Sequence, residues 1–176
     1  MLEQCTFDTF IVANLQQDSA KKQVEEFAEN PNGWLVLSGR TGTGKTHLSV
    51  AVIGTLLNNG KACKYMMWRD EVPKLKAMIN EVEYEKQMNF LKTVEVLYID
   101  DFFKGSITQA DVNLAFELLN HRAVKKLTTI ISTELTLNAI SKIDGAIAGR
   151  LVEHSKVVSM QNGENYRLRG VKTGRS

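Results

Sequence analysis

Residues 39–46 read GRTGTGKT, and this stretch decides how the rest of the sequence is interpreted. It follows a short apolar run from Trp34 to Ser38 and precedes a helical pattern over residues 44–57. Glycines at this spacing let backbone N–H groups approach phosphate oxygens, and the amino end of the following helix attracts negative charge. Lys45 can reach the β- and γ-phosphates, and the Thr46 hydroxyl can ligate Mg²⁺. The stretch therefore predicts a loop that binds ATP or ADP together with Mg²⁺.

The predicted nucleotide-binding residues cover the whole loop and one position beyond it. They are Gly39, Arg40, Thr41, Gly42, Thr43, Gly44, Lys45, Thr46 and His47. The structural alternative is a glycine-rich turn from strand to helix that contains a lysine by chance. For Arg40 a solvated loop position competes with a phosphate contact.

Composition sets the class of protein. The chain has 176 residues, a formal net charge of +2 and 43% hydrophobic residues, which is typical of one globular domain and argues against a strongly polybasic nucleic-acid binder. No run reaches the roughly 18 apolar residues of a membrane span, and the amino end lacks a signal-peptide pattern. Cys5 and Cys63 lie far apart and form no CxxC motif, so we expect reduced thiols in a cytoplasmic protein.

Short apolar runs alternate with helical periods, and this predicts an α/β fold: a three-layer αβα P-loop NTPase with a five-stranded, mainly parallel sheet. The expected strands cover residues 34–38, 62–68, 94–99, 128–132 and 156–160, with a return hairpin over 162–168. The expected helices cover residues 18–29, 44–57, 70–82, 83–92, 108–124 and 143–153. Asp70 is the expected cap of the helix 70–82, whose apolar face is Leu75, Met78, Ile79 and Val82. The helix 108–124 is expected to begin with a capping box of Thr108 and Asp111 and to bury a stripe of Val112, Ala115, Phe116, Leu119 and Ala123. In domain terms, 1–30 is a linker with the first helix, 31–161 the nucleotide-binding core and 162–176 a short basic tail.

Two acidic residues, Asp100 and Asp101, follow the apolar strand 94–99. Acids at the carboxyl end of a buried parallel strand lie at the edge of the sheet where ligands bind. We expect Asp100 to hold the hydration shell of Mg²⁺, and Asp101 to orient or deprotonate the attacking water. Asp is one methylene shorter than the Glu that many ATPases have at the second position, which predicts slow hydrolysis. The alternative is that both acids cap the following turn.

Polar residues also end the strand 128–132, and a single arginine lies on a late helix. Thr133 and Glu134 can reach the γ-phosphate or its water, although capping of the loop explains them nearly as well. Arg150 can stabilise transition-state charge on a neighbouring subunit's ATP. A salt bridge to Glu153 or simple solvation is the alternative.

The order of these features resembles the AAA+ ATPases, and more closely the DnaC/DnaI-type replicative helicase loaders, including phage-encoded versions, and the related IstB transposition helpers. Five segments carry the resemblance: 5–10, 39–48, 96–103, 128–136 and 147–151. The resemblance implies that Phe10 of an amino-terminal linker lies near the adenine. It also implies that Thr133 or Glu134 fills the sensor 1 position and that Arg150 is the arginine finger.

The resemblance further implies an ATP-dependent switch in DNA replication, with a replicative DnaB-type helicase and single-stranded DNA as partners and a homo-oligomer when ATP is bound. No membrane partner is expected. The helices between 70 and 92 take the place of an insertion that lines a DNA groove in these loaders, and Arg122 is a further candidate for DNA or subunit contact. The lysines that can line the groove are Lys74, Lys76, Lys86 and Lys92.

Two elements usual in such proteins are not expected in this chain: a helicase-binding amino-terminal domain and a carboxyl-terminal helical lid. The basic tail, with Arg167, Arg169, Lys172 and Arg175, is expected to be a frayed end. Three other functions stay open: an IstB-like transposition helper, a small-molecule P-loop kinase, and a nucleotide-binding adaptor that does not hydrolyse ATP.

Overall fold

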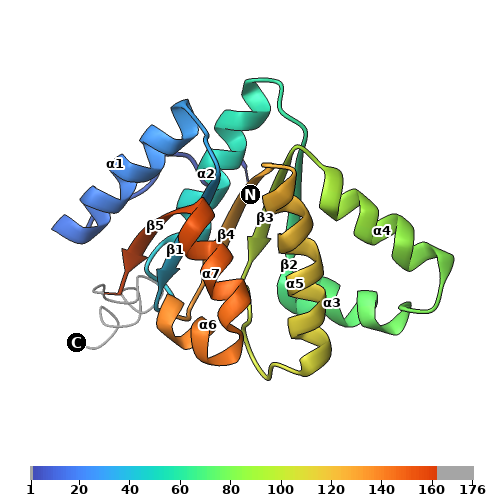
Figure 1. The fold of residues 1–176 in the computed structure, drawn as a ribbon. Helices are drawn as coiled ribbons and strands as arrows, with labels where there is room; N and C mark the ends of the chain where they lie inside the picture. The colour runs from blue at the N-terminus through green and yellow to red at the C-terminus, as the bar shows by residue number, and fades with distance from the viewer. Residues whose placement is uncertain (1, 162–176) are drawn as a thin grey trace, which may run out of the picture.

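A computed structural model describes residues 2–161 and contains one five-stranded parallel sheet (Figure 1). The strands are β1 (Trp34–Gly39), β2 (Cys63–Met67), β3 (Val96–Asp100), β4 (Thr128–Thr133) and β5 (Ser155–Met160). Their order across the sheet is β2-β3-β4-β1-β5, and every neighbouring pair is parallel. The α/β class, the five strands and the parallel sheet predicted from the sequence are confirmed.

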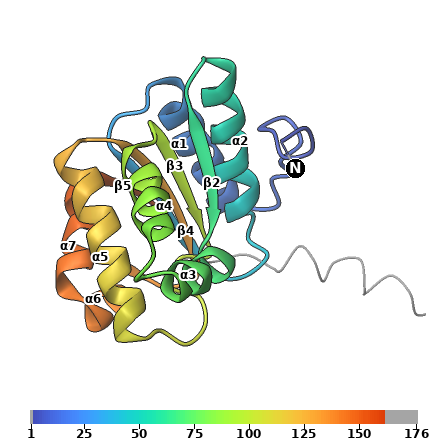
Figure 2. The same cartoon turned by 90° about the vertical axis from the view of Figure 1, so that its right-hand side faces the viewer.

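Helices cover both faces of the sheet (Figures 1 and 2). They are α1 (Leu15–Glu29), α2 (Lys45–Asn58), α3 (Trp68–Ala77), α4 (Val82–Thr93), α5 (Gln109–Val124), α6 (Leu137–Ile143) and α7 (Gly145–His154). Strand β1 shows how one strand serves two cores: Leu35 and Leu37 pack with α1 and α2, whereas Trp34 and Val36 pack with the helices of the other face. This period of two explains why β1 is apolar throughout and buried at every position.

The strand order brings the carboxyl ends of β1, β3 and β4 together. Strand β4 lies between the other two, with Ser38 paired to Thr133 and Ile99 paired to Ile131. The phosphate loop leaves β1 at this edge, and the turn after β3 leaves it beside the end of β4. One edge of the sheet therefore collects all the polar strand ends that the sequence singled out.

The helix predicted over 70–82 differs from the structure at both ends. Helix α3 begins at Trp68 and ends at Ala77, so Asp70 lies in its first turn and not at its cap. Its buried face is formed by Trp68, Val72 and Leu75, and the chain then turns, with the Glu81 amide donating to the Met78 carbonyl at 2.8 Å. The predicted apolar face therefore fails beyond Met78, and Ile79 and Val82 are 54% and 75% exposed.

Helix α6 was not predicted from the sequence. Thr136 caps its amino end by accepting a hydrogen bond from the Ala139 amide at 3.1 Å, and Ile140 is its one buried residue. Because one residue alone is buried, the helix lacks the repeat of apolar residues by which an amphipathic helix is recognised in a sequence. The helix predicted over 143–153 begins at Gly145, after the Asp144 cap.

Arg122 is a structural residue, and its predicted contact with DNA or another subunit is wrong. The side chain is fully buried and donates to carbonyl oxygens of Leu91, Val94 and Thr128 and to the Thr129 hydroxyl, at 2.7–2.9 Å. Burial lowers the pKa of Arg122 to about 10, so it stays charged at neutral pH. Arg122 thus fastens α5 to the starts of β3 and β4.

Phe116 was expected on the buried stripe of α5, but it is 37% exposed. The predicted hairpin over 162–168 and the basic tail lie outside the described residues. Within residues 2–161, no helix is long and apolar enough to cross a membrane.

Candidate nucleotide-binding site

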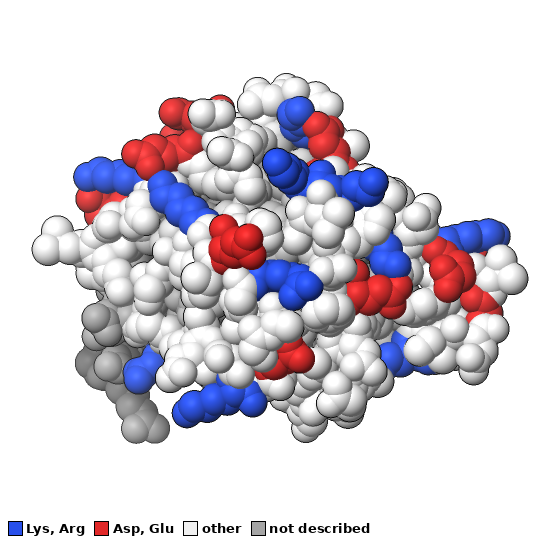
Figure 3. All heavy atoms as spheres, in the orientation of Figure 1, with Lys and Arg blue, Asp and Glu red and all other residues white. Residues whose placement is uncertain are grey.

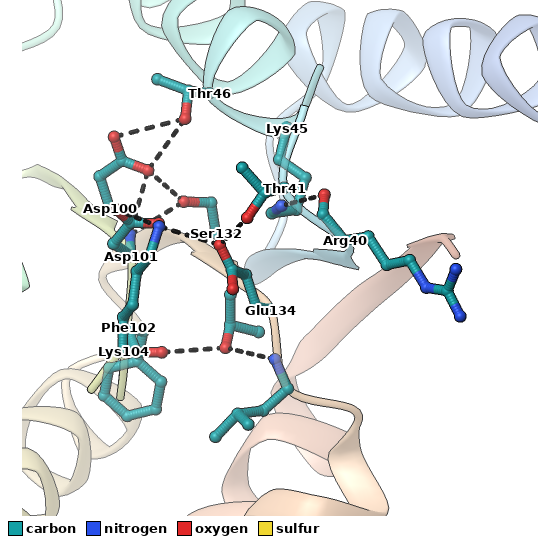
Figure 4. Close-up of polar contacts among 12 residues, drawn as sticks. Arg40, Thr41, Lys45, Thr46, Asp100, Asp101, Phe102, Lys104, Ser132 and Glu134 are labelled. Atoms are coloured by element: carbon teal, nitrogen blue, oxygen red, sulfur yellow. Dashed lines mark hydrogen bonds and ion pairs between the residues drawn. The ribbon is translucent and has the colours of Figure 1, made fainter. Parts of the chain in front are cut away.

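The phosphate loop closes over the Lys45 side chain. Gly42 and Gly44 have φ angles of +79° and +99°, the left-handed region that favours glycine. The Lys45 ammonium donates to the Arg40 carbonyl oxygen at 2.9 Å, inside the curve of the loop (Figure 4). The Arg40 side chain is exposed and points away from these groups, as Figure 4 shows. The Lys45 ammonium therefore lies inside the curve of the phosphate loop, whereas the Arg40 guanidinium lies outside it.

The amino end of α2 also faces the inside of the phosphate loop. Its cap residue is Gly44, and no side chain caps it. Uncapped N–H groups and the helix dipole form a site for an anion. Lys45 is 6% exposed, and burial lowers the pKa of its ammonium, so an anionic phosphate beside it would offset the cost of burying this charge.

Thr46 and Asp100 meet across the gap between α2 and β3. The Thr46 hydroxyl lies 3.2 Å from Oδ1 and 3.4 Å from Oδ2 of Asp100. Two neighbours orient this carboxylate: the Tyr65 hydroxyl donates to Oδ2 at 3.0 Å, and the Ser132 hydroxyl donates to Oδ1. A hydroxyl and a carboxylate brought together from two elements are oxygen ligands of the type that Mg²⁺ takes.

A second polar group lies beside the loop. The Lys104 ammonium is 3.2 Å from Oδ2 of Asp101 and 2.9 Å from Oε1 of Glu134. The same Glu134 oxygen accepts a hydrogen bond from the Thr41 hydroxyl of the phosphate loop. The Thr41 hydroxyl and then the Lys104 ammonium hold the pKa of Glu134 below its usual range. Asp101 and Glu134 are therefore drawn together, although one follows β3 and the other β4.

Thr133 and Glu134, which were both candidates for one role, have different surroundings. The Thr133 hydroxyl is buried, donates to the Phe102 carbonyl at 2.9 Å and accepts from the Leu135 amide at 3.1 Å. Glu134 faces the phosphate loop, as Figure 4 shows. Glu134 therefore contacts the phosphate loop, whereas the Thr133 hydroxyl holds the ends of β3 and β4 together.

The amino-terminal segment forms the other wall of the site. Phe10 is 7% exposed, and its ring lies so close to Gly44 that a Cβ there would be 2.5 Å from Phe10 Cε2. The His47 ring packs edge-on against Phe10, at 5.3 Å between centroids, and its Nε2 lies 2.8 Å from the Thr6 carbonyl. A cavity of about 350 Å³ opens here, lined by Phe10, His47, Gln17 and residues 42–46. An apolar wall next to the phosphate loop suits a nucleotide base.

Arg150 lies apart from this cavity. Its Nε donates to Asn120 Oδ1 at 3.1 Å, and its guanidinium lies 4.5 Å from the centroid of the Phe116 ring. It also donates to the Ala146 carbonyl at 3.0 Å, so its contacts lie on α5 and α7. No salt bridge to Glu153 is present among the described residues. The structure thus does not bring Arg150 to the phosphate loop of its own chain.

The lysines proposed to line a DNA groove are mostly paired with acids. Lys76 lies 2.7 Å from Asp111, Lys86 lies 3.7 Å from Glu83, and Lys92 contacts Glu117. In the view of Figure 3, basic and acidic side chains are interspersed. These pairs weaken any positive field over α3 and α4.

Four contact residues were missed as site residues: Gln17, Tyr65, Lys104 and Ser132. Ser132 directly precedes Thr133 and Glu134, the two candidates at the end of β4. Its place near the carboxyl end of this strand could have marked it as a site residue. Gln17 accepts from the Ala13 amide at 2.8 Å and donates to the Thr43 carbonyl at 3.2 Å, which links the amino-terminal segment to the loop. No sequence pattern marks Gln17, Tyr65 or Lys104 as functional.

A glycine-rich loop before a helix, a hydroxyl–carboxylate pair beside that loop and this strand order define an AAA+ type P-loop ATP-binding domain. The comparisons with known proteins agree. The family of IstB-like ATP binding proteins matches residues 6–173, and the chain belongs to that family.

Curated relatives include replication and insertion-sequence proteins. YqaM of Bacillus subtilis is 32% identical over 123 residues, 66% of this chain and 39% of YqaM. The replicative helicase loader DnaC of Escherichia coli is 23% identical over 173 residues, 95% of this chain and 71% of DnaC. An ATP-binding protein of the insertion sequence IS21 from Pseudomonas aeruginosa is 27% identical over 170 residues, 93% of this chain and 62% of that protein. The chain thus spans between two fifths and three quarters of these relatives.

Solved structures share the fold. A crystal structure of the DnaC helicase loader superposes with a TM-score of 0.80 at 21% identity, covering 91% of this chain and 98% of that chain. The replication initiator DnaA bound to AMPPCP and single-stranded DNA gives a TM-score of 0.79 at 20% identity, covering 97% of this chain and 54% of that chain. The predicted resemblance to AAA+ domains of the DnaC/DnaI and IstB type is confirmed.

Proposed function

We propose that this chain is the Mg²⁺-dependent ATPase domain of a helicase loader, which binds single-stranded DNA and a replicative helicase when it holds ATP. The observation that carries the ATPase part is the convergence of Lys45, Thr46 and Asp100 at the amino end of α2. Lys45 contacts the β- and γ-phosphates, and Thr46 and Asp100 hold Mg²⁺. When bound, Mg²⁺ offsets phosphate charge during transfer of the γ-phosphoryl group to water.

Asp101 and Glu134 act at the reacting end of the nucleotide. Asp101 orients or deprotonates the attacking water, and Glu134 contacts the γ-phosphate or that water through its place at the end of β4. Phe10 and His47 contact the base. Arg150 acts on the ATP of a neighbouring subunit, which is supported by its position on α7 outside the site of its own chain.

Phosphate release and nucleotide binding test the ATPase part. Wild type should bind Mg-ATP and release phosphate slowly. Lys45→Ala should lose most of its ATP affinity, and Asp101→Asn should bind ATP but turn it over at least about tenfold more slowly. Lys61→Ala is the matched control, because Lys61 pairs with Glu95 at the opposite edge of the sheet. Wild type that binds ATP without turnover, with or without DNA, would favour the adaptor.

The loader part rests on the likeness to DnaC, and its test is a choice of partner. Purified protein with ATP should retain a replicative DnaB-type helicase and bind single-stranded DNA with an affinity that falls as salt rises. ADP should weaken both interactions. Binding that is equal with ATP and ADP would contradict the switch.

A transposition helper is the second candidate, because insertion-sequence proteins are among the relatives of this chain. It predicts that ATP-bound protein retains a transposase of the IS21 type and does not retain the helicase. A small-molecule kinase is tested in the same assays, since it would form ADP only when a small hydroxyl acceptor is added.

A further inference from the structure

The turn after β3 places a second ammonium group beside the phosphate loop. Residues 101–104 form this turn, closed by a hydrogen bond from the Lys104 amide to the Asp101 carbonyl at 3.1 Å. Asp101 and Phe103 adopt φ angles of +55° and +57°, which non-glycine residues rarely do. Such strained backbone persists only where the surroundings enforce it.

Packing and hydrogen bonds enforce this turn. Phe102 and Phe103 are almost fully buried, with their rings stacked at 4.1 Å between centroids. The Phe102 amide donates to the Ser132 carbonyl at 2.9 Å, and its carbonyl accepts from the Thr133 hydroxyl. The turn is therefore fixed to the end of β4, and so is the base of the Lys104 side chain.

The Lys104 ammonium contacts three carboxylate oxygens among the described residues: Oδ1 and Oδ2 of Asp101 at 3.3 and 3.2 Å, and Oε1 of Glu134 at 2.9 Å. Its side chain is 27% exposed, so these contacts do not enclose the ammonium. The Glu134 oxygen that it contacts, Oε1, also accepts a hydrogen bond from the Thr41 hydroxyl of the phosphate loop. The Lys104 ammonium is therefore linked to the phosphate loop through this single oxygen.

Charge supports a role for this donor. Three carboxylates face the phosphate end of the site, those of Asp100, Asp101 and Glu134, and a triphosphate adds further negative charge. With Lys45 as the one cation, these carboxylates and the triphosphate would carry a large excess of negative charge. The Lys104 ammonium reduces the repulsion between the phosphates and the two acids that it contacts, Asp101 and Glu134.

We propose that Lys104 donates a hydrogen bond to the γ-phosphate of ATP, so that it acts with Lys45 to distinguish ATP from ADP. The inference rests on the proposed ATP-binding function. The turn, fixed by the buried Phe102 and Phe103, holds the ammonium beside Glu134 and the phosphate loop of the same chain, where the γ-phosphate would be its nearest phosphate group. Lys104 is thus a specificity-determining residue supplied by the same chain.

The test compares the affinities for AMPPCP and ADP, both with Mg²⁺, by calorimetry. Lys104→Met should weaken AMPPCP binding about 10- to 100-fold, as for loss of a hydrogen bond to a charged group, and change ADP binding by no more than about twofold. Lys104→Arg should keep most of the preference for AMPPCP. Lys61→Met is the control and should leave both affinities unchanged.

The double variant Lys104→Met/Glu134→Gln separates direct contact from charge balance. Direct contact predicts that AMPPCP binding stays weak in the double variant; recovery of wild-type affinity would overturn the proposal, because the ammonium would then only neutralise Glu134. Equal weakening of AMPPCP and ADP by Lys104→Met would also overturn it. Wild type that binds neither nucleotide would instead overturn the proposed function.

Discussion

The hydroxyl oxygen of Thr46 lies 3.2 Å from Oδ1 of Asp100, although the two residues are 54 positions apart and belong to α2 and β3. This relationship predicts that nucleotide binding depends on Mg²⁺. Thr46→Val and Asp100→Asn should each reduce the Mg²⁺-dependent gain in ATP affinity by about tenfold or more, whereas Thr46→Ser should keep it. Titrations of ATP with and without Mg²⁺ measure the gain. Full Mg²⁺ dependence in Thr46→Val would contradict the metal assignment.

The proposed contact of Phe10 with the base predicts an equal contribution to ATP and ADP binding, because the two nucleotides share the base. We expect Phe10→Ala to weaken both nucleotides about tenfold, and Phe10→Leu to weaken them less. Leu15→Ala is the control, since Leu15 is 89% exposed. A loss confined to ATP would show that Phe10 does not face the base.

Arg122→Met should lower the free energy of unfolding by about 3–5 kcal/mol, because it leaves several buried carbonyl groups without a donor. Arg122→Lys should be nearly as harmful, since one ammonium cannot replace the fork of the guanidinium. Urea denaturation measures the loss, and Lys125→Met on the exposed end of the same helix is the control. An unfolding free energy within about 1 kcal/mol of wild type would be incompatible with the buried network.

Arg150→Ala should bind ATP normally but turn it over at least about tenfold more slowly, if it acts on a neighbour's nucleotide. Mixing it with Asp101→Asn protein should restore part of the activity, because some sites then combine an intact Asp101 with an intact Arg150. Asn120→Ala, which removes the main partner of Arg150, should have a smaller effect. Absence of recovery at every mixing ratio would leave Arg150 a structural residue.

The lowered pKa of Glu134 predicts a small decrease in the free energy of unfolding at acidic pH. Its pKa is lowered in the folded protein, so the contribution is present above its usual value of 4.5 and is lost as the pH falls through the folded value. The carboxylate is 33% exposed, and solvent screening limits the effect to about 0.5 kcal/mol. Urea midpoints between about pH 5 and pH 3 should therefore fall less steeply for Glu134→Gln than for wild type. Identical slopes would mean that Thr41 and Lys104 do not hold the carboxylate in solution.

Local sequence predicted the strands well, because a buried parallel strand needs a continuous apolar run whatever its neighbours are. It also predicted the capping box of α5, where Thr108 and Asp111 bond to each other's backbone amides, since both partners lie within one turn. The phosphate loop could be recognised for the same reason: its function depends on residues that are adjacent in the chain.

The contacts that depend on packing between distant segments could not be predicted. At the end of β4, Ser132 contacts Asp100 and Thr133 does not, because the pleat of the strand turns successive side chains to opposite faces. Lys104 faces Glu134 only because the turn after β3 takes up two left-handed residues. Arg122 would be expected at the surface from its sequence alone, and it is buried because the end of α4 and the residues after it pack against α5.

Arg122 has a consequence for how the two ends of the domain are connected. The helix that it fastens to β3 and β4 also carries Phe116 and Asn120, which grip Arg150. The strand that ends in Asp100 and the helix that contacts Arg150 are thus parts of one connected frame within the chain. A substitution at Arg122 should therefore disturb both the position of Asp100 and the contacts of Arg150.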